Sequence, residues 1–273
     1  MGLLLSRYLT LELTRACNYT CPYCAASSGK PLRNELTKEE IFGLLAKVKP
    51  DYLAITGGEP LLRKDLFEII DFGNRFGRVR LNTNGSLITP AAAEKLNAHE
   101  ILISVDGLPE KNAALRGENN FDHILKALDN LEAAGKLNRV RLCITASKEN
   151  LDEIAGVINY FSPRVRRFGI GKLAPMGRAG KDKMLSRREA AGLYFRLLPL
   201  RLKNSIYFYY EFGGFLRVVP RDLTILADGS IVPCCLVRKP VGNVRTAKGL
   251  PWLSKFCLLF LSGCADCKRL RPG

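Results

Sequence analysis

A strand-like stretch followed at once by three cysteines, YLTLELTRACNYTCPYC (residues 8–24), decides how the rest of this sequence is interpreted. Apolar and polar side chains alternate over residues 8–14, which predicts a β-strand. Cys17, Cys21 and Cys24 follow immediately, so the strand delivers three thiols to one loop. Three closely spaced thiolates can converge on one iron–sulfur cube and leave one iron open to another molecule. Zinc is the competing metal, but a structural zinc site needs a fourth cysteine or histidine, and none lies nearby in the sequence.

Strand-like and helix-like segments alternate from residue 8 to about residue 200. Six such βα units predict an α/β fold with a parallel sheet and right-handed crossovers, in which ligands bind at the carboxyl ends of the strands. The predicted strands are 8–14, 51–56, 79–84, 101–106, 139–147 and 167–174. The predicted helices are 36–48, 65–76, 90–97, 121–135, 150–161 and one that begins near residue 186.

The character of the sequence changes after about residue 202. An aromatic, strand-like segment is followed by a predicted β-hairpin around Asp228-Gly229, a predicted helix over 251–261 and a final cysteine pair. We therefore expect a core over 1–200 and a small hairpin-and-helix module over 201–273.

Charge and composition narrow the class of protein. The chain has a net charge of +16, and residues 164–203 hold 12 Lys or Arg against two acidic residues, an excess of +10. Such a segment favours an acidic substrate, an acidic electron donor or nucleic acid, and a solvated charged face is the plain alternative. Nothing in the sequence resembles a signal peptide or a membrane span, so a soluble, cytoplasmic protein is expected. The sequence contains no glutamine, which weakly favours a thermophilic source organism.

The three-cysteine loop resembles the signature of the radical S-adenosylmethionine (SAM) enzymes, because CxxxCxxC follows the first strand and an aromatic residue, Tyr23, precedes the last cysteine. The resemblance covers roughly residues 8–175. It implies a partial (β/α)6 barrel and a [4Fe-4S] cluster on Cys17, Cys21 and Cys24. The open iron would chelate SAM, and reductive cleavage of SAM would give a 5′-deoxyadenosyl radical. Tyr23 would contact SAM on its adenine side.

Further segments at predicted strand ends agree with this family. Thr56-Gly57-Gly58-Glu59-Pro60 matches its GGEP motif, which contacts the SAM amino group; alone, it would be a glycine-rich turn with a surface glutamate. Asn82 and Ser104 are similar to residues near the SAM ribose and carboxylate. The candidate catalytic residues are Asp106 and Arg116, although Arg116 suits a surface cation equally well. Other candidates for a catalytic base are Tyr207, Tyr209, Tyr210 and Glu211.

The C-terminal cysteines resemble the SPASM module or its shorter form, twitch, which carry auxiliary iron–sulfur clusters. Cys234, Cys264 and Cys267 would hold one such cluster, and a zinc site is the alternative. The cysteine that relatives carry before the hairpin is missing, which leaves the fourth ligand open between Cys235, Cys257 and no protein ligand. Cys257 lies in an apolar stretch, which favours a position in the core. Cys143, in a predicted strand of the barrel, is also expected in the core.

Together these features predict an enzyme whose radical abstracts hydrogen from a small molecule or peptide, in an oxidation, a dehydrogenation or a bond-forming maturation step. The expected partners are a possibly acidic substrate and an electron donor such as ferredoxin or flavodoxin, with neither membrane nor nucleic acid. One alternative is an enzyme of cofactor biosynthesis that binds substrate at an open auxiliary iron. Another is an iron–sulfur electron carrier or a zinc-bound nucleic-acid-binding protein, which leaves the GGEP motif unexplained.

Overall fold

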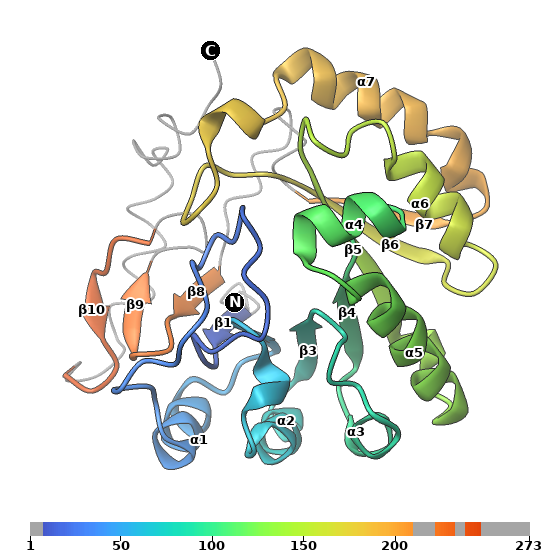
Figure 1. The fold of residues 1–273 in the computed structure, drawn as a ribbon. Helices are drawn as coiled ribbons and strands as arrows, with labels where there is room; N and C mark the ends of the chain where they lie inside the picture. Colours follow the sequence, from blue (N-terminus) through green and yellow to red (C-terminus); the bar gives the residue numbers. More distant parts are fainter. Residues whose placement is uncertain (1–7, 210–221, 233–237, 247–273) are drawn as a thin grey trace, which may run out of the picture.

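A single twisted sheet forms the framework of the protein. The computed structural model describes residues 8–209, 222–232 and 238–246. Within these residues ten strands lie in the order β10-β9-β8-β1-β2-β3-β4-β5-β6-β7 (Figure 1). The strands are β1 (Tyr8–Glu12), β2 (Tyr52–Thr56), β3 (Arg78–Thr83), β4 (Glu100–Ser104), β5 (Val140–Ala146), β6 (Arg167–Lys172), β7 (Ser205–Phe208), β8 (Asp222–Ile225), β9 (Ser230–Val232) and β10 (Gly242–Asn243).

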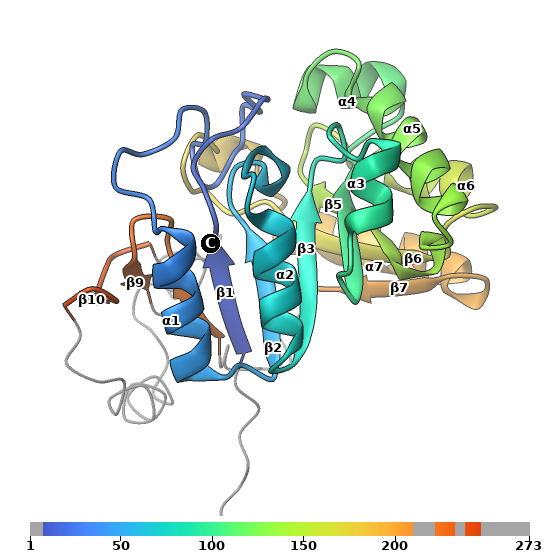
Figure 2. The same ribbon diagram turned by 90° about the horizontal axis from the view of Figure 1, so that it is seen from below.

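Helices connect the parallel strands and cover the outer side of the curved sheet, as Figures 1 and 2 show for α1, α2 and α3 beside β1, β2 and β3. Neighbouring strands from β1 to β7 are all parallel, which confirms the predicted α/β fold with a partial barrel. The α-helices are α1 (Lys38–Val48), α2 (Leu66–Asn74), α3 (Pro90–Lys95), α4 (Pro109–Arg116), α5 (Asn120–Ala133), α6 (Ile154–Phe161) and α7 (Arg187–Leu197). Short 3-10 helices are η1 (Pro60–Leu62), η2 (Leu137–Arg139), η3 (Lys181–Lys183) and η4 (Pro199–Leu202).

Local sequence signals account for most of these elements. The side chain of Thr37 accepts a hydrogen bond from the backbone N–H of Glu40, and the carboxylate of Glu40 accepts one from the backbone N–H of Thr37, so α1 begins at the predicted capping box. Along the strands, alternate residues such as Leu9 and Leu11 are fully buried beneath the helices. Helix α4 was not predicted, because its sequence PEKNAALR is largely polar.

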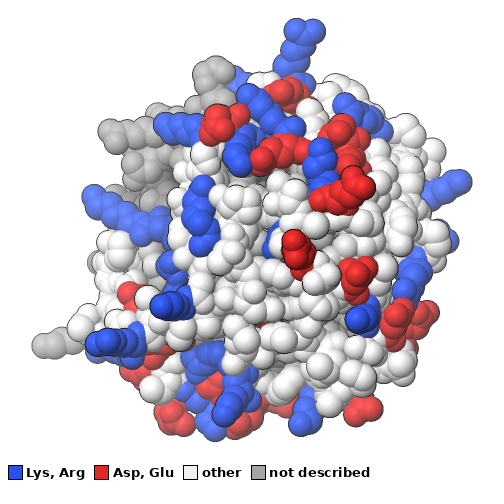
Figure 3. Space-filling view, in the orientation of Figure 1, with Lys and Arg blue, Asp and Glu red and all other residues white. Residues whose placement is uncertain are grey.

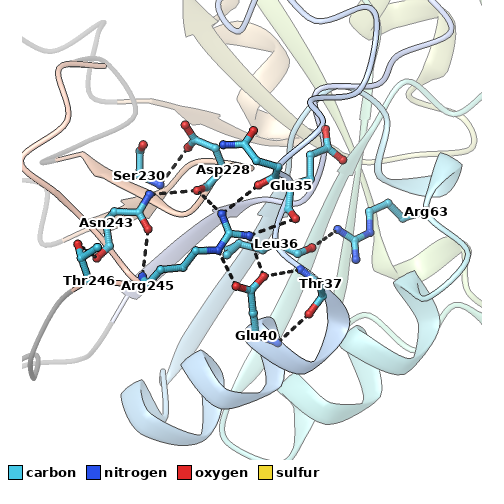
Figure 4. Close-up of polar contacts among 11 residues, drawn as sticks. Glu35, Leu36, Thr37, Glu40, Arg63, Asp228, Ser230, Asn243, Arg245 and Thr246 are labelled. Atoms are coloured by element: carbon cyan, nitrogen blue, oxygen red, sulfur yellow. Dashed lines mark hydrogen bonds and ion pairs between the residues drawn. The ribbon is translucent and has the colours of Figure 1, made fainter.

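The predicted hairpin is present, and it joins the same sheet as the barrel. Strands β8 and β9 are antiparallel around Gly229, and β8 lies parallel to β1 at the free edge of the barrel. Arg245, beyond β10, donates from Nε and Nη2 to the carboxylate of Glu40 at 2.5 and 2.8 Å, and from Nη1 to the carbonyl oxygen of Asp228 at 3.2 Å (Figure 4). The predicted division near residue 200 stays a prediction, although β7 places residues 205–208 beside β6 in the barrel sheet.

Several lysines and arginines of the basic segment 164–203 form ion pairs or hydrogen bonds. The segment therefore presents less unpaired positive charge than its composition alone predicts. Arg164 forms ion pairs with Asp129 and Glu132, and Lys183 pairs with Glu149. On the face shown in Figure 3, lysine and arginine side chains alternate with acidic ones around much of the rim. Among the described helices, none combines the length and the apolar character that a bilayer span requires.

The fully buried ring of Phe161 gives a direct test of this packing. It lies 5.5 Å from the ring of Phe121, centroid to centroid, in the core between α5 and α6. Phe161→Ala should lower the free energy of unfolding by about 3–5 kcal/mol, because it removes buried apolar area and leaves a cavity. Phe195→Ala is the matched control: its side chain is 66% exposed, so the change should stay within about 0.5 kcal/mol. Urea unfolding measures both, and equal effects would contradict the assigned core.

Candidate active site

The three-cysteine loop lies at the carboxyl ends of the barrel strands, where a parallel sheet binds its ligands. Its two arms are held together by a hydrogen bond from the backbone N–H of Cys17 to the carbonyl of Gly29, at 2.9 Å. Glu35 fixes the entry to the loop, because its Oε1 accepts from the Thr14 hydroxyl at 3.0 Å and from the Arg15 N–H at 2.7 Å. The loop is thus anchored before its first cysteine.

The thiols of Cys17, Cys21 and Cys24 are free, half-buried and close enough to affect one another's ionisation. Burial raises the pKa of Cys17, and the neighbouring Cys21 and Cys24 raise it further. Burial likewise raises the pKa of Cys21, while the nearby Arg116 lowers it. Such thiols lose their protons on binding a metal, whose positive charge offsets the cost of burying thiolates.

This donor set fits an iron–sulfur cluster. Within residues 8–209, 222–232 and 238–246, no group of three or more His, Cys, Asp or Glu residues is placed to hold a single metal ion. A cubane distributes its thiolate ligands over separate irons, so it does not require three ligands around one point. Cys17, Cys21 and Cys24 are the residues that would hold it.

The connection between β6 and α7 also forms hydrogen bonds to the cysteine loop, which no feature of the sequence predicted. Arg178, between β6 and α7, donates from Nε to the carbonyl of Cys21 and from Nη1 to that of Ser28, both at 2.8 Å. Its backbone N–H donates to the carbonyl of Cys24 at 3.1 Å. No motif marks this arginine, because the two segments meet only in the folded chain.

The GGEP segment after β2 packs backbone against backbone on the start of the cysteine loop. The N–H groups of Gly58 and Glu59 donate to the carbonyls of Thr14 and Ala16, each at 2.8 Å. A Cβ atom on Gly58 would lie 2.1 Å from the carbonyl oxygen of Ala16, so a larger residue does not fit. In this structure the close approach that the glycines permit is to the cysteine loop itself.

Glu59 is fully buried, and protein groups occupy both of its carboxylate oxygens. Oε1 accepts from the Thr83 hydroxyl at 2.8 Å and from the Leu61 N–H at 3.0 Å, and Oε2 accepts from the Asn84 N–H at 2.8 Å. Burial raises the pKa of Glu59 to about 6, against the lowering effect of these hydrogen bonds. Its side chain therefore ties the end of β2 to the end of β3, and the neighbouring Pro60 is buried at the start of η1.

The two candidate catalytic residues form a buried ion pair beneath the cysteine loop. Nε of Arg116 donates to Oδ2 of Asp106 at 2.6 Å, and the hydroxyl of Tyr23 donates to the same oxygen. Oδ1 of Asp106 accepts from the Thr145 N–H at 2.6 Å. Burial alone would lower the pKa of Arg116, but Asp106 raises it above its usual range. Arg116 is therefore not a surface cation, because this ion pair binds it inside the protein.

The predicted site residues Asn82 and Ser104 lie on strands β3 and β4, where the alternation of the sequence predicted strands. Asn82 occupies the inner face of β3, and its buried Oδ1 has no hydrogen-bond partner among the described residues. Ser104 ends β4, where it pairs in register with Cys143 of β5. Cys143 is half-buried and lies 3.5 Å from the Tyr209 hydroxyl, so its surroundings are more polar than a plain core position. The other candidate bases, Tyr210 and Glu211, fall outside the described residues, whereas Tyr207 is exposed.

The five C-terminal cysteines all lie outside the described residues. The predicted auxiliary site therefore remains a prediction from the sequence. It concerns Cys234, Cys235, Cys257, Cys264 and Cys267.

Comparison with known proteins decides the family. The sequence profile of the Radical SAM superfamily matches residues 11–161, which is more than half of the chain. This chain belongs to the radical SAM superfamily. The family implies a [4Fe-4S] cluster and SAM, and the matched range contains the three-cysteine loop, the GGEP segment and the Asp106–Arg116 pair.

Two radical SAM relatives and one solved structure illustrate the similarity. Mycofactocin maturase MftC from Mycolicibacterium smegmatis is 36% identical over 253 residues, which cover 86% of this chain but only 62% of MftC. GTP 3′,8-cyclase from Alkaliphilus oremlandii is 30% identical over 258 residues, 83% of this chain and 80% of the cyclase. Streptococcus suis SuiB bound to precursor peptide SuiA has the same fold, with a TM-score of 0.75 at 18% identity over 91% of this chain and 65% of SuiB.

The raised pKa of Glu59 predicts a pH dependence of stability. The folded protein binds the proton more tightly than the unfolded chain, whose glutamate has an ordinary pKa near 4.5. The contribution of Glu59 is therefore fully present below about pH 4.5 and is lost as the pH rises through about 6, by about 2 kcal/mol. Glu59→Gln, which does not titrate, should lack this loss.

Urea unfolding of the metal-free wild type and the variant, compared at each pH, isolates the effect, because other titrating groups cancel in the difference. A stability difference between the two proteins that does not change with pH would contradict the assignment.

Proposed function

We propose that this chain is an enzyme that cleaves SAM reductively and uses the resulting radical to abstract hydrogen from a substrate bound in the barrel. The cluster on Cys17, Cys21 and Cys24 would supply the electron and chelate the SAM amino and carboxylate groups. The observation that carries the proposal is the docking of the GGEP segment against the cysteine loop, which supports one site shared by cluster and SAM. Asn82 and Ser104 would line the SAM site from β3 and β4.

The buried pair of Asp106 and Arg116 is better suited to positioning than to proton transfer. Both carboxylate oxygens of Asp106 already accept hydrogen bonds from protein donors, which leaves no free edge for a substrate proton. The Tyr23 hydroxyl bonds to this carboxylate, so we assign an adenine contact near Tyr23 to its backbone rather than its side chain. In this proposal Asp106 and Arg116 hold the Tyr23 segment of the cysteine loop against α4.

For the reaction we favour an oxidative or bond-forming maturation step on a peptide. The similarity to a maturase supports this class, and the fold of SuiB, solved with a precursor peptide, is compatible with it. A cofactor-forming reaction on a small molecule is the second candidate, supported by the similarity to GTP 3′,8-cyclase over most of both chains. A ferredoxin or flavodoxin would supply the electron in either case.

We also propose one auxiliary cluster in the C-terminal segment, held by Cys234, Cys264 and Cys267. The spacing of these cysteines in the sequence supports this proposal. We assign the fourth ligand to Cys235 because it directly follows Cys234.

Iron content tests the main cluster. The reconstituted protein should hold about eight irons, four for each cube. Replacing Cys17, Cys21 and Cys24 together by alanine should remove about half of the iron and all formation of 5′-deoxyadenosine from SAM. Cys143→Ala is the matched control and should keep both. Full iron content in the triple variant would refute the proposed site, and formation of S-adenosylhomocysteine with a methylated product would refute the reaction class.

Single substitutions test the auxiliary cluster and separate the two candidate reactions. Cys235→Ala should lose the auxiliary iron, whereas Cys257→Ala should retain it, as iron and sulfide analysis would show. A closed cluster can only pass electrons, which favours oxidation. If both variants keep their full iron content, the fourth iron is open to substrate, and the cofactor-forming reaction is favoured instead.

A further inference from the structure

An arginine inside the barrel forms no hydrogen bond or ion pair with the described residues. Arg80 lies in the middle of β3, between Val79 and Leu81, which are both fully buried on the helix side of the sheet. Because successive side chains of a strand point to opposite faces, Arg80 lies on the inner face, the concave side in Figure 1. Its guanidinium carbon is 5.7 Å from the centroid of the Tyr8 ring. Among the described residues Arg80 forms no hydrogen bond or ion pair, and its Nε is buried without an acceptor.

Two other inward-facing arginines nearby are neutralised by the protein. Arg141 on β5 donates from Nε and Nη2 to Oε1 of Glu100, at 2.9 and 2.6 Å. Arg238 forms an ion pair with both carboxylate oxygens of Glu12 at the end of β1. An unpaired buried donor on a charged group costs free energy, and no described residue supplies an acceptor for Nε of Arg80. Glu100, which lies in register with Arg80 on β4, accepts from Arg141 instead. A ligand that brings its own negative charge would offset this cost.

The position of Arg80 places such a ligand beside the SAM site. Asn82 lies two residues further along the same face of β3, so the two Cα atoms are roughly 7 Å apart, with Asn82 nearer the cysteine loop. The buried Oδ1 of Asn82 also lacks a partner among the described residues. The rings of Tyr8 and Tyr52 stack at 5.3 Å between centroids and form an aromatic wall beside Arg80.

We propose that Arg80 binds a carboxylate group of the substrate inside the barrel, one inward-facing position below the SAM site. The proposal rests on the proposed function and adds a chemical class to its substrate. A carboxylate accepts two parallel hydrogen bonds from one edge of a guanidinium, and Nε–H forms half of that edge. A single unpaired guanidinium balances one negative charge, which favours a carboxylate over a doubly charged phosphate group.

Binding of small probes to the full-length, reconstituted protein with SAM tests this assignment. Phenylacetate carries a carboxylate and a ring suited to the tyrosine wall, phenylacetamide is its neutral counterpart, and inorganic phosphate tests the competing anion. Calorimetric titration should show saturable binding of phenylacetate and much weaker binding of the other two. Arg80→Gln should weaken phenylacetate binding on the order of 10- to 100-fold, the effect of losing a charge-assisted bidentate pair. Arg80→Lys should fall between the wild type and Arg80→Gln, because it keeps the charge but loses the planar edge.

Arg188→Gln is the matched control, because Arg188 is an exposed arginine on α7 and not on the inner face of the barrel; the variant should bind phenylacetate like the wild type. Urea unfolding adds a second measurement. Arg80→Gln should be at least as stable as the wild type, since it removes an unpaired buried cation, and a marked loss of stability would point to a structural role and overturn the proposal.

Any one of three results would overturn the carboxylate site. These are equal phenylacetate affinity in Arg80→Gln and the wild type, tighter binding of phosphate than of phenylacetate, and no saturable binding of phenylacetate to the wild type. Iron content and SAM cleavage are measured on the same wild-type samples. Their absence would refute the proposed function separately and would leave the comparison of probe binding intact.

Discussion

The backbone contact between the GGEP segment and the entry to the cysteine loop is the constraint on which the site depends. The N–H groups of Gly58 and Glu59 reach the carbonyls of Thr14 and Ala16 only because residue 58 has no Cβ. This contact joins the ends of β1 and β2, and the side chain of Glu59 extends the connection to β3. Three strand ends are thereby fixed around the loop that carries Cys17, Cys21 and Cys24. Burying the Glu59 carboxylate has a cost, visible in its raised pKa, and the hydrogen bonds from its three donors offset it.

A second set of buried charges holds the opposite side of the loop. Asp106 receives donors from α4, β5 and the cysteine loop, so three elements meet at one carboxylate. Arg116 neutralises it, and the pair is stable because each charge is both paired and hydrogen-bonded. Arg178 adds donors from the β6–α7 connection to carbonyls of the same loop. The loop is therefore held by backbone-to-backbone contacts on one side and by charged side chains on the other.

The arginines on the inner face of the barrel differ in whether a carboxylate neutralises them. Arg141 and Arg238 are each matched by a carboxylate, whereas Arg80 faces an aromatic wall without an acceptor among the described residues. The contrast matters because the cost of an unmatched charge rises as water is excluded. This contrast between Arg80 and the paired arginines is the basis for the proposed binding of a substrate carboxylate at Arg80.

The sequence by itself determined the order of the strands and helices of the barrel apart from α4, the cap at Thr37, the hairpin at Gly229 and the three-cysteine loop. These depend on alternation, capping and turn chemistry within a few residues, and the spacing of the cysteines and of GGEP identified the family. Only the tertiary structure decided that Glu59 and Asp106 accept hydrogen bonds from protein donors and that Arg178 donates to the cysteine loop. It also decided that Arg80 has no hydrogen bond or ion pair within the described part of the chain. Those outcomes depend on which side chains meet across distant strands. Pairing and burial arise between segments that no local pattern connects.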